Sequence, residues 1–370
     1  MRPESPIDMP ALRVRELDPR TDRRWQEFVA GHPEGLIYHH PAWLQVLEHE
    51  YGDNLIALAC EDGAGNIHGL LPLCRTRGVP LRLGGALAGR RLSSLPRTPI
   101  GGPLASSAEA AAALVDAAVE LVRGDSGLRL ELKPPAPIEG VDSVPWSMSY
   151  VLELPVDAAG IRFGSARNHG RIKWAVSKAS RAGVRVRVAE TEGDLRSWYR
   201  LYLEAMRAHA VPPRPRSFFL TAWRALHPRG MLRLLLAERP EGSRLTLLAG
   251  SIFLMFGQTV VFAFNGRSSR ELAFRPNDAI HWQAIHDACR DGFQRYDLGE
   301  VERDQSGLDQ FKRKWGAEPR LLHRYYFPPL DRRSPIDVPP SRRARLRKAV
   351  WQRLPLDATE ALGTHLYRYL

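Results

Sequence analysis

Short apolar runs separated by turn signals alternate, along the first half of the chain, with stretches of helical periodicity. Residues 41–52, PAWLQVLEHEYG, begin with a proline and end with a glycine, and they predict a helix. The apolar runs 54–62 and 67–75 flank the turn sequence GAGN and predict a hairpin. Residues 106–124 predict a second helix, with Ser107 as its N-terminal cap.

The second half contains the same mixture of patterns. Helices are expected where apolar positions repeat every three or four residues, and strands where short β-branched or aromatic runs occur. The expected helices are 161–182, 194–210, 218–226, 277–292 and 307–316, and the expected strands are 149–155, 184–190, 231–238, 295–299 and 320–327.

One stretch, residues 245–266, carries no charge over 22 residues and is long enough to cross a bilayer. Gly257 and Gln258 interrupt it in the middle, and its two halves are rich in Phe, Val, Ile and Thr. These features favour a buried hairpin over a membrane helix. We therefore expect a soluble protein.

The length of 370 residues favours two domains with separate cores. A proline-rich passage, residues 133–146, separates the halves, and the composition changes again near residue 328. We expect domains at 1–149 and 150–328, and a basic, proline-rich tail with an amphipathic helix at 329–370. The interspersed strands and helices indicate an α+β fold, with mixed sheets flanked by helices.

The charge balance points towards anionic partners. Lys and Arg number 53 against 41 Asp and Glu, which gives a formal net charge of +12. This excess favours a phosphate-bearing cosubstrate, RNA or an anionic membrane face as partner. The alternative is that the many arginines simply reflect a GC-rich genome. The three cysteines lie far apart and the N-terminus has no apolar signal core, so a reducing cytoplasm is expected.

The most basic stretch opens the second half. Between Asp157 and Glu190 lie eight Lys or Arg residues and no acidic residue. On a helix, Arg167 and Arg171 share a side away from the apolar positions, and Lys173 extends the cationic surface. The pattern favours phosphate binding. A solvated helix face is the alternative, although such faces normally mix charges of both signs.

Two carboxylates accompany the end of a predicted strand in the sequence RYDLGE. Asp297 closes the strand, and Glu300 follows Gly299. A carboxylate at the C-terminal end of a strand often faces a cleft in α/β sheets. A turn-forming aspartate is the alternative.

The sequence GLDQFKRKWGAE, residues 307–318, predicts a short helix with an unusual edge. Phe311 and Trp315 share an apolar stripe, and Lys312 lies at its boundary. This position suits a lysine held against a groove, whereas a lysine that only reaches past the apolar face to solvent is the alternative. Arg313 and Lys314 are expected to be ordinary surface charges.

The preceding helix contains residues that suggest a metal site without supporting one. His281, His286 and Cys289 have none of the spacings typical of metal ligands, so no metal is expected. Asn277 or Asp278 is the expected N-terminal cap of this helix.

Several segments, in order, resemble the Fem-type aminoacyl and acyl transferases, which consist of tandem domains of the GNAT fold. The segment NDAIHWQAIHDACRDGFQRYDLGE, followed by GLDQFKRKWGAEPRLLHRYYF, resembles the C-terminal part of the sequences of that family. Its first domain is similar to IYHHPAWLQVLEHEYG, GLLPL and IGGPLA, and its basic helix to RNHGRIKWAVSKASRAGVRV. The resemblance covers about residues 36–327 and rests on the order and spacing of these segments.

This resemblance implies two GNAT-like domains and an N-acyltransferase activity. An acetyl, acyl or aminoacyl group would pass to an amine on a precursor of exopolysaccharide, peptidoglycan or another envelope glycan. The second domain would carry the reaction groove. Lys312 would lie near the reacting acyl group, and Asp297 would lie at a strand end beside the groove. We expect Lys312 to stabilise the oxyanion or the acceptor's carboxyl end, and Asp297 or Glu300 to accept the amine proton.

The donor stays open between acyl-CoA and aminoacyl-tRNA as cosubstrate, with no bound cofactor. The loop that would hold a CoA pyrophosphate, residues 265–278, has a single glycine. The expected partners are a small-molecule or lipid-linked glycan and tRNA, and the alternative function is a non-catalytic module that binds an anionic glycan precursor or RNA. The expected substrate-binding residues are Arg167, Arg171, Lys173, Asn277, Asp278, Trp315 and Tyr326.

The tail carries a further candidate surface at residues 341–354. Leu346, Val350 and Leu354 recur every four residues, Trp351 lies beside them, and six basic residues cover the rest. This pattern is typical of a helix that lies on anionic lipid, so the expected location is the cytoplasm with peripheral contact at the inner face of the membrane. A helix docked on its own domain is the alternative.

Overall fold

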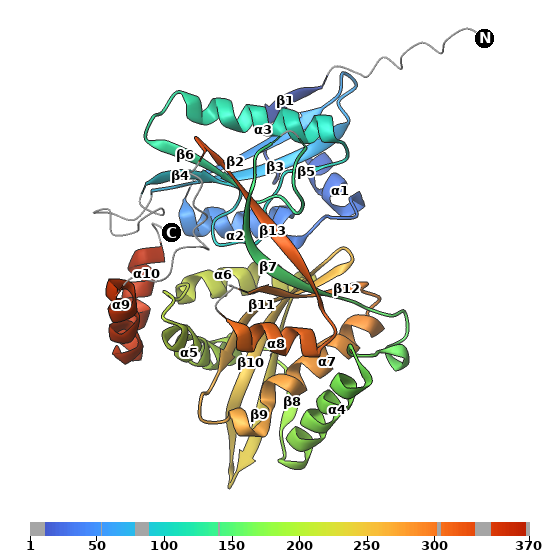
Figure 1. Ribbon diagram of the computed structural model, residues 1–370, viewed down its shortest axis with the longest axis vertical. Helices are drawn as coiled ribbons and strands as arrows, with labels where there is room; N and C mark the ends of the chain where they lie inside the picture. The colour runs from blue at the N-terminus through green and yellow to red at the C-terminus, as the bar shows by residue number, and fades with distance from the viewer. Residues whose placement is uncertain are drawn as a thin grey trace, which may run out of the picture.

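A computed structural model describes residues 12–52, 54–77, 89–139, 141–301, 305–329 and 342–367 (Figure 1). The helices are α1 (Arg23–Gly31), α2 (Pro41–Tyr51), α3 (Ala108–Arg123), α4 (Ala166–Arg181), α5 (Glu192–His209), α6 (Arg216–Leu226), α7 (Pro276–Arg290), α8 (Ser306–Lys314), α9 (Arg342–Arg353) and α10 (Leu356–Tyr367). The strands are β1 (Arg13–Glu16), β2 (Leu55–Glu61), β3 (Ile67–Thr76), β4 (Arg90–Ser93), β5 (Leu104–Ala105), β6 (Leu128–Leu132), β7 (Val144–Glu153), β8 (Arg185–Val188), β9 (Leu232–Glu241), β10 (Arg244–Phe256), β11 (Thr259–Arg267), β12 (Arg295–Val301) and β13 (Glu318–Phe327).

The described strands form one continuous path of hydrogen-bonded neighbours, β1-β2-β3-β4-β6-β13-β7-β12-β11-β10-β9-β8, with β5 paired to β3. The long strands β7 and β13 run side by side between the two halves of the molecule (Figure 1). β13 pairs with β6 of the first half and with β7, and β7 also pairs with β12 of the second half. The predicted α+β class is confirmed. The predicted division at residue 149/150 falls within β7 and stays a prediction.

The uncharged stretch 245–266 is a hairpin, as predicted. β10 and β11 pair in antiparallel fashion around Gly257, which adopts a φ of 54° at the turn. Positive φ is accessible to glycine at little cost, which explains why the run is interrupted there. No helix within the described ranges combines the length and the apolar character needed to cross a bilayer.

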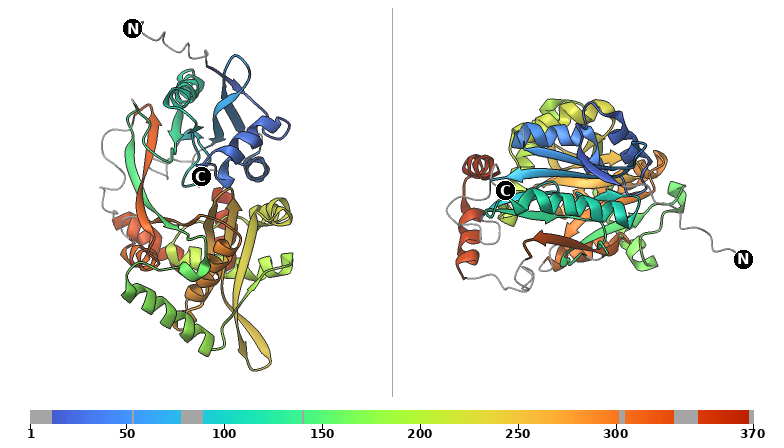
Figure 2. Two further views of the ribbon diagram at one scale, coloured as in Figure 1. Left: turned by 90° about the vertical axis from the view of Figure 1, so that its right-hand side faces the viewer. Right: turned by 90° about the horizontal axis from the view of Figure 1, so that it is seen from above.

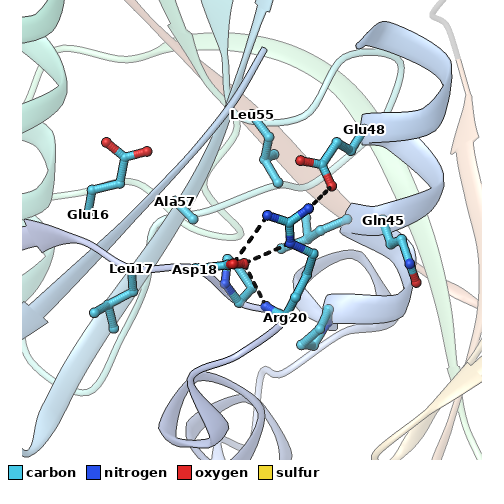
Figure 3. Close-up of a pocket in the computed structure, with 11 residues that line it drawn as sticks. Glu16, Leu17, Asp18, Arg20, Gln45, Glu48, Leu55 and Ala57 are labelled. Atoms are coloured by element: carbon cyan, nitrogen blue, oxygen red, sulfur yellow. Dashed lines mark hydrogen bonds and ion pairs between the residues drawn. The ribbon is translucent and has the colours of Figure 1, made fainter. Parts of the chain in front are cut away.

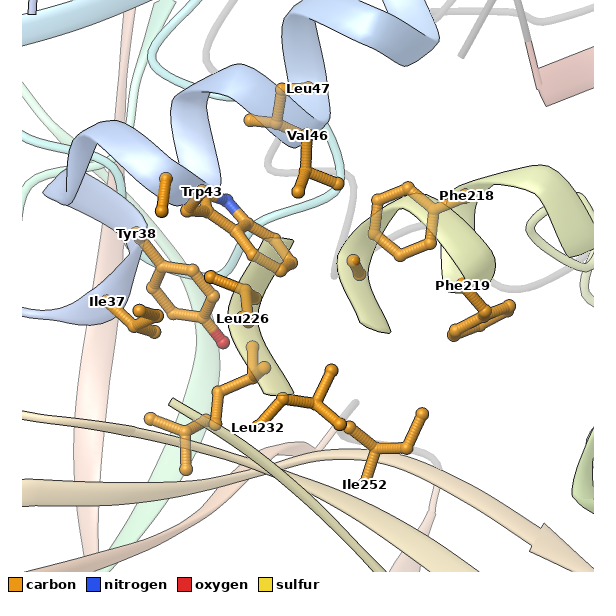
Figure 4. Packing of buried hydrophobic residues seen from close by; sticks show 14 of the residues in the cluster. Ile37, Tyr38, Trp43, Val46, Leu47, Phe218, Phe219, Leu226, Leu232 and Ile252 are labelled. Carbon is orange, nitrogen blue, oxygen red and sulfur yellow. The ribbon is translucent and has the colours of Figure 1, made fainter. Parts of the chain in front are cut away.

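The two halves share one hydrophobic core, in which α2 of the first half packs against α6 of the second (Figure 4). The rings of Trp43 and Phe218 meet edge to face, with centroids 5.9 Å apart. Ile252 of β10 closes the core from the sheet side (Figure 4). Because fully buried side chains of this size contribute about 1.5–3 kcal/mol each, the halves are held together by apolar burial.

The second-half sheet is covered on both faces. Along β9 and β10, Leu236 and Ile252 face the shared core with α5 and α6, whereas Leu235 and Phe253 face a second core under α4 and α7. This alternation is the two-residue period of a strand buried on both sides. In the first half, α3 covers the sheet over a third core.

The tail docks on the second half as two helices at the edge of the molecule (Figure 2). Both α9 and α10 contact α5. Tyr367 of α10 is fully buried, and Gly363 lies so close to Pro213 that a Cβ would fall 2.5 Å from the proline ring. Docking of the tail on its own domain is therefore confirmed for these helices.

Candidate active site

A cavity of about 740 Å³ opens where β11 and β12 separate. These parallel strands pair only from Thr259 to Val261 on β11, and then diverge. The cavity walls include Phe264, which packs with the core shared by both halves, and Phe311, which packs with the core under α7. The cavity therefore reaches both faces of the sheet, and its volume is in the range of small-molecule sites.

The charge of the cavity wall is one-sided. Arg97, Arg214, Arg267 and Lys312 line it, and no Asp or Glu is among its lining residues. Within the described part of the chain, none of these four cations forms an ion pair with a carboxylate. The remainder of the wall is largely apolar, with Phe262 and Leu298 among its members. Such a cavity suits a ligand that is anionic and partly apolar.

Arg214 is the most deeply enclosed of these cations, with 3% of its surface exposed. Its guanidinium donates to the hydroxyl of Tyr367 and, at 2.8 Å, to the carbonyl oxygen of Arg97. The guanidinium carbon lies 4.4 Å from the ring centroid of Phe218. An arginine buried without a counter-ion is costly. A bound anion would supply the missing charge.

The Arg97 side chain comes from a strained segment of the first half. Leu95 and Arg97 both have positive φ, at 63° and 52°, which is uncommon for residues with a Cβ. Buried Lys133 fixes this segment by donating to the carbonyl oxygen of Leu95 at 2.7 Å. Burial lowers the pKa of Lys133 to about 7. Such strain persists only when the surroundings over-determine the segment, and it concentrates at functional sites.

Lys312 reaches the cavity from α8, with 3% of its surface exposed. Its Nζ donates to the carbonyl oxygens of Gly299 and Glu300, at 2.9 and 3.0 Å. A lysine has three donor hydrogens, so one is left for a ligand. Burial lowers the pKa of Lys312 to about 8, and nearby Asp297 and Glu300 oppose this effect.

The two predicted acids lie beside Lys312, on β12. Asp297 is buried, and its Oδ1 accepts from the Gly299 amide at 2.7 Å and from the hydroxyl of Ser149 at 3.2 Å. Burial raises the pKa of Asp297, and the Gly299 hydrogen bond and Lys312 oppose the rise. Glu300 accepts from Ser147. Neither acid is among the residues that line the cavity.

The irregularity of β12 explains how a lysine and two acids converge there. The register of β12 against β7 shifts between Asp297 and Glu300, and Gly299 adopts a φ of 79°. Such a bulge turns carbonyl groups away from the strand ladder. The carbonyl oxygens of Gly299 and Glu300 are the ones that Lys312 binds.

Two predictions for α8 need correction. Trp315 is fully buried and packs edge to face on Phe163, with ring centroids 4.9 Å apart, so it anchors the helix and does not line the cavity. Lys314 is not an ordinary surface charge, because its ammonium pairs with buried Asp278. Arg313 does behave as predicted, with an exposed ion pair to Asp309 at 2.9 Å.

The start of α7 also differs from the expectation. Its cap is Arg275, in the left-handed conformation at φ 60°, with Pro276 in the first turn and no side-chain cap. Asn277 lines the cavity. Asp278 is 4% exposed and already holds Lys314, so a direct role in substrate binding is not supported for it.

The predicted phosphate-binding residues lie on α4, away from the cavity wall. Arg167, Arg171 and Lys173 are exposed, and among the described residues they form no ion pair with a carboxylate. Trp174 beside them is 52% exposed, with the Nζ of Lys178 lying 5.4 Å from its ring centroid. An exposed aromatic among unpaired cations can stack on a base or hold phosphates.

Tyr326 lies outside the cavity, whereas His281 is one of the residues that line it. Tyr326 pairs in register with Glu131 on β6, in the seam between the halves, and does not line the cavity. His281 is buried, its Nδ1 lies 2.7 Å from the hydroxyl of Tyr296, and burial lowers its pKa to about 3. Within the described ranges, no cluster of three or more His, Cys, Asp or Glu could hold a metal ion.

A smaller cavity of about 210 Å³ lies in the first half, beside α2 (Figure 3). Its cation, Arg20, is already paired with Asp18 and Glu48, at 3.0 and 3.3 Å (Figure 3). None of the predicted site residues lines it. Because the one cation that lines it is already paired, the cavity at β11 and β12 is the better candidate for an anionic ligand.

Sequence patterns identified Lys312 but missed Arg97 and Arg214. Arg214 stands in the proline-rich segment VPPRPRS, where nothing distinguishes a buried arginine from a solvated one. Its only local signal is the set of flanking prolines, which fix the backbone into extended conformations. Arg97 belongs to the first half, and only the shared core brings it to the cavity.

Comparison with known proteins identifies similar folds. Residues 165–313 match the family described as the acetyltransferase (GNAT) domain, and a search of curated protein sequences gave no match. The structure of FemX is similar with a TM-score of 0.63 and 16% identity, over 85% of this chain and 97% of that chain. The C-terminal domain of a putative lysylphosphatidylglycerol synthetase from Agrobacterium fabrum is similar with a TM-score of 0.52 and 13% identity, over 82% and 90%.

A conserved protein of unknown function from Bacteroides thetaiotaomicron has the same TM-score of 0.52, with 8% identity, over 85% of this chain and 99% of that chain. At these identities the likeness concerns the fold. The resemblance to Fem-type transferases and the GNAT fold is confirmed at that level, distantly and over most of the chain.

Proposed function

We propose that this protein is an N-acyltransferase that moves an activated acyl or aminoacyl group to an amine on an anionic precursor of a cell-envelope glycan. The observation that carries the proposal is the cavity at β11 and β12, which combines several cations with no carboxylate and includes Lys312 in its wall. In this arrangement Arg97 and Arg214 hold the anionic part of the acceptor. The amine lies near Lys312.

The chemistry requires a neutral amine, a proton acceptor and a group that stabilises the oxyanion. The amine nitrogen attacks the acyl carbon, a C–N bond forms, and the C–O or C–S bond to the leaving group breaks. Lys312 donates its free hydrogen to the oxyanion, while Gly299 and Glu300 hold the ammonium in place. Asp297 receives the amine proton through water, because it lies beside Lys312 but outside the cavity wall, and burial raises its pKa. The leaving oxygen or sulfur takes up the proton that Asp297 received, which restores the carboxylate.

The donor's phosphates are assigned to the exposed cations of α4. Arg167, Arg171 and Lys173 suit either an aminoacyl-tRNA backbone or the phosphates of acyl-CoA. Trp174 lies among them and adds a stacking surface for a base. The two donors differ in how strongly their binding depends on salt, because a tRNA contacts more cations at once.

A donor screen tests this function. The full chain is incubated with acyl-CoA species or charged tRNA together with amine-bearing nucleotide-sugar and lipid-linked glycan precursors, and products are identified by mass spectrometry. Turnover that depends on Lys312 and survives Arg313→Ala supports the proposal, since Arg313 is an exposed neighbour on the same helix.

The alternative is a binding module without catalysis. It has one observation in its favour, because the loop before α7 contains a single glycine where a CoA pyrophosphate would be held. If the chain bound a glycan precursor tightly but gave no product with either class of donor, the alternative would replace the enzyme.

A further inference from the structure

Helix α9 presents an apolar pair to solvent. Leu346 is 67% exposed and Val350 is 54% exposed, and the two are four residues apart on one face of the helix. Both belong to the part of the tail that docks on α5. Covering adjacent exposed aliphatic side chains with another apolar phase removes their surface from water and lowers the free energy of the system.

Two hydrogen bonds join the C-terminal part of α9 and the residue after it to α5. The side chain of Gln352 donates to the carbonyl oxygen of Ala208 at 2.7 Å, and Arg207 donates to the carbonyl oxygen of Leu354 at 3.1 Å. These bonds fix the helix on α5 and determine which face points outward. The outward position of Leu346 therefore follows from the docking of the tail.

The charge around the apolar pair has one sign. Residues 342–353 include six Lys or Arg and no acidic residue. Arg345, Arg347 and Lys348 are exposed next to Leu346. A cationic surface with aliphatic residues at its centre fits a bilayer with anionic headgroups. An RNA surface would instead be expected to expose aromatic side chains among the cations, whereas Trp351, the aromatic residue of α9, is only partly exposed.

The docked helix α9 lies beside a residue of the cavity wall, because Gln352 bonds to Ala208 and the next residue, His209, lines the cavity. His209 and Arg267 line the cavity, and burial, followed by the charges of Arg267 and Lys348, lowers the pKa of His209. The basic surface of α9 therefore lies beside one residue of the cavity wall.

We propose that α9 rests on an anionic bilayer through Leu346, Val350 and the surrounding cations, so that the cavity receives an acceptor anchored in that bilayer. The binding of α9 to the bilayer does not depend on the proposed function. The delivery of a lipid-anchored acceptor to the cavity rests on that function and narrows the acceptor to an anionic headgroup carried by a lipid.

Vesicle co-sedimentation of the full chain tests the binding. Vesicles of phosphatidylcholine alone are compared with vesicles that also contain phosphatidylglycerol. The double variant Leu346→Asp/Val350→Asp and the variant Arg345→Glu/Lys348→Glu are compared with Leu245→Asp, a matched control on β10 that is also 67% exposed. Binding to the anionic vesicles is expected to fall about tenfold or more in both α9 variants and to stay unchanged in the control.

Several results would overturn the proposal. These are equal sedimentation of the wild type and both α9 variants, an equal loss with Leu245→Asp, or binding to an RNA homopolymer with none to anionic vesicles. Unfolding temperatures of the variants show whether a loss reflects misfolding. The sedimentation assay contains no acyl donor, so it tests binding alone. If the chain bound anionic vesicles but gave no product in the donor screen, the membrane surface would stand and only the acyltransferase function would be contradicted.

Discussion

The ammonium of Lys312 lies 2.9 Å from the carbonyl oxygen of Gly299, at the bulge where β12 loses its register against β7. The carbonyl groups at this bulge hold a cation that would otherwise be free to rotate. A buried donor whose position is fixed before the reaction needs no reorganisation when charge develops on the substrate. The bulge in β12 therefore fixes the position of the Lys312 ammonium.

Replacing Lys312 with Met should remove this donor while keeping most of the side-chain volume. We expect kcat for acyl transfer to fall by about 10²–10³, because the loss of one oxyanion partner has that typical effect. Steady-state kinetics would measure it, with the thermal unfolding midpoint as a check on folding. Arg313→Ala, on the exposed side of α8, serves as the control. Near-wild-type turnover in a folded Lys312→Met protein would refute the assignment.

The activity should depend on pH in a way that reports the ammonium. Burial lowers the pKa of Lys312 to about 8, so the protonated form is lost as the pH rises through that value. We expect kcat to decline above pH 8 and to decline less in Lys312→Arg, since arginine stays protonated. Folding stability should move in the opposite direction in this range, because the unfolded lysine, with its higher pKa, binds more protons than the folded one. A flat activity profile between pH 7 and about 9 would contradict the role of the ammonium.

The tail helix α10 should act on the cavity through Arg214. The hydroxyl of Tyr367 accepts a hydrogen bond from the guanidinium. Tyr367→Phe removes the hydroxyl that accepts this bond and keeps the buried ring, and a hydrogen bond to a charged group contributes about 1.5–3 kcal/mol. We expect the KM for an anionic acceptor to rise about tenfold with little change in kcat. Tyr325→Phe, on β13, is the matched control, and an unchanged KM in Tyr367→Phe would show that the tail does not position Arg214.

Close packing of α5 on β11 should make Gly266 intolerant of any side chain. A Cβ at this position would lie 2.6 Å from the backbone nitrogen of Tyr202. Gly266→Ala should therefore lower the free energy of unfolding by roughly 1–3 kcal/mol, as overpacked cores do. Chemical denaturation measures the change. Gly63→Ala, where nothing lies within 4 Å, should be nearly neutral, and equal stability of the two variants would disprove the packing constraint.

Local elements followed from the sequence because their signals are local. The hairpin around Gly257 and the helix α3 behind Ser107 were predicted from turn and cap residues, and both lie as expected. Lys312 could be selected as a candidate site residue for the same reason, since it stands at the edge of an apolar stripe on its own helix.

Pairings between distant segments were beyond such reasoning. Nothing around Arg97 or Arg214 indicates that the two meet, because the meeting depends on a core built from both halves. Lys314 was misjudged for a similar reason. Its buried partner Asp278 belongs to another helix, and sequence spacing does not reveal that contact.

The placement of β13 has a consequence for how the chain is made. Tyr326 on β13 pairs with Glu131 on β6, and Leu321 pairs with Met148 on β7, so the last strand completes sheets that begin far earlier. A ribosome that has released only the first half leaves the edges of β6 and β7 open. Such edges invite pairing with other chains until they are covered. The nascent protein therefore depends on β13, and a stop before Glu318 would leave an aggregation-prone fragment in place of a free-standing first domain.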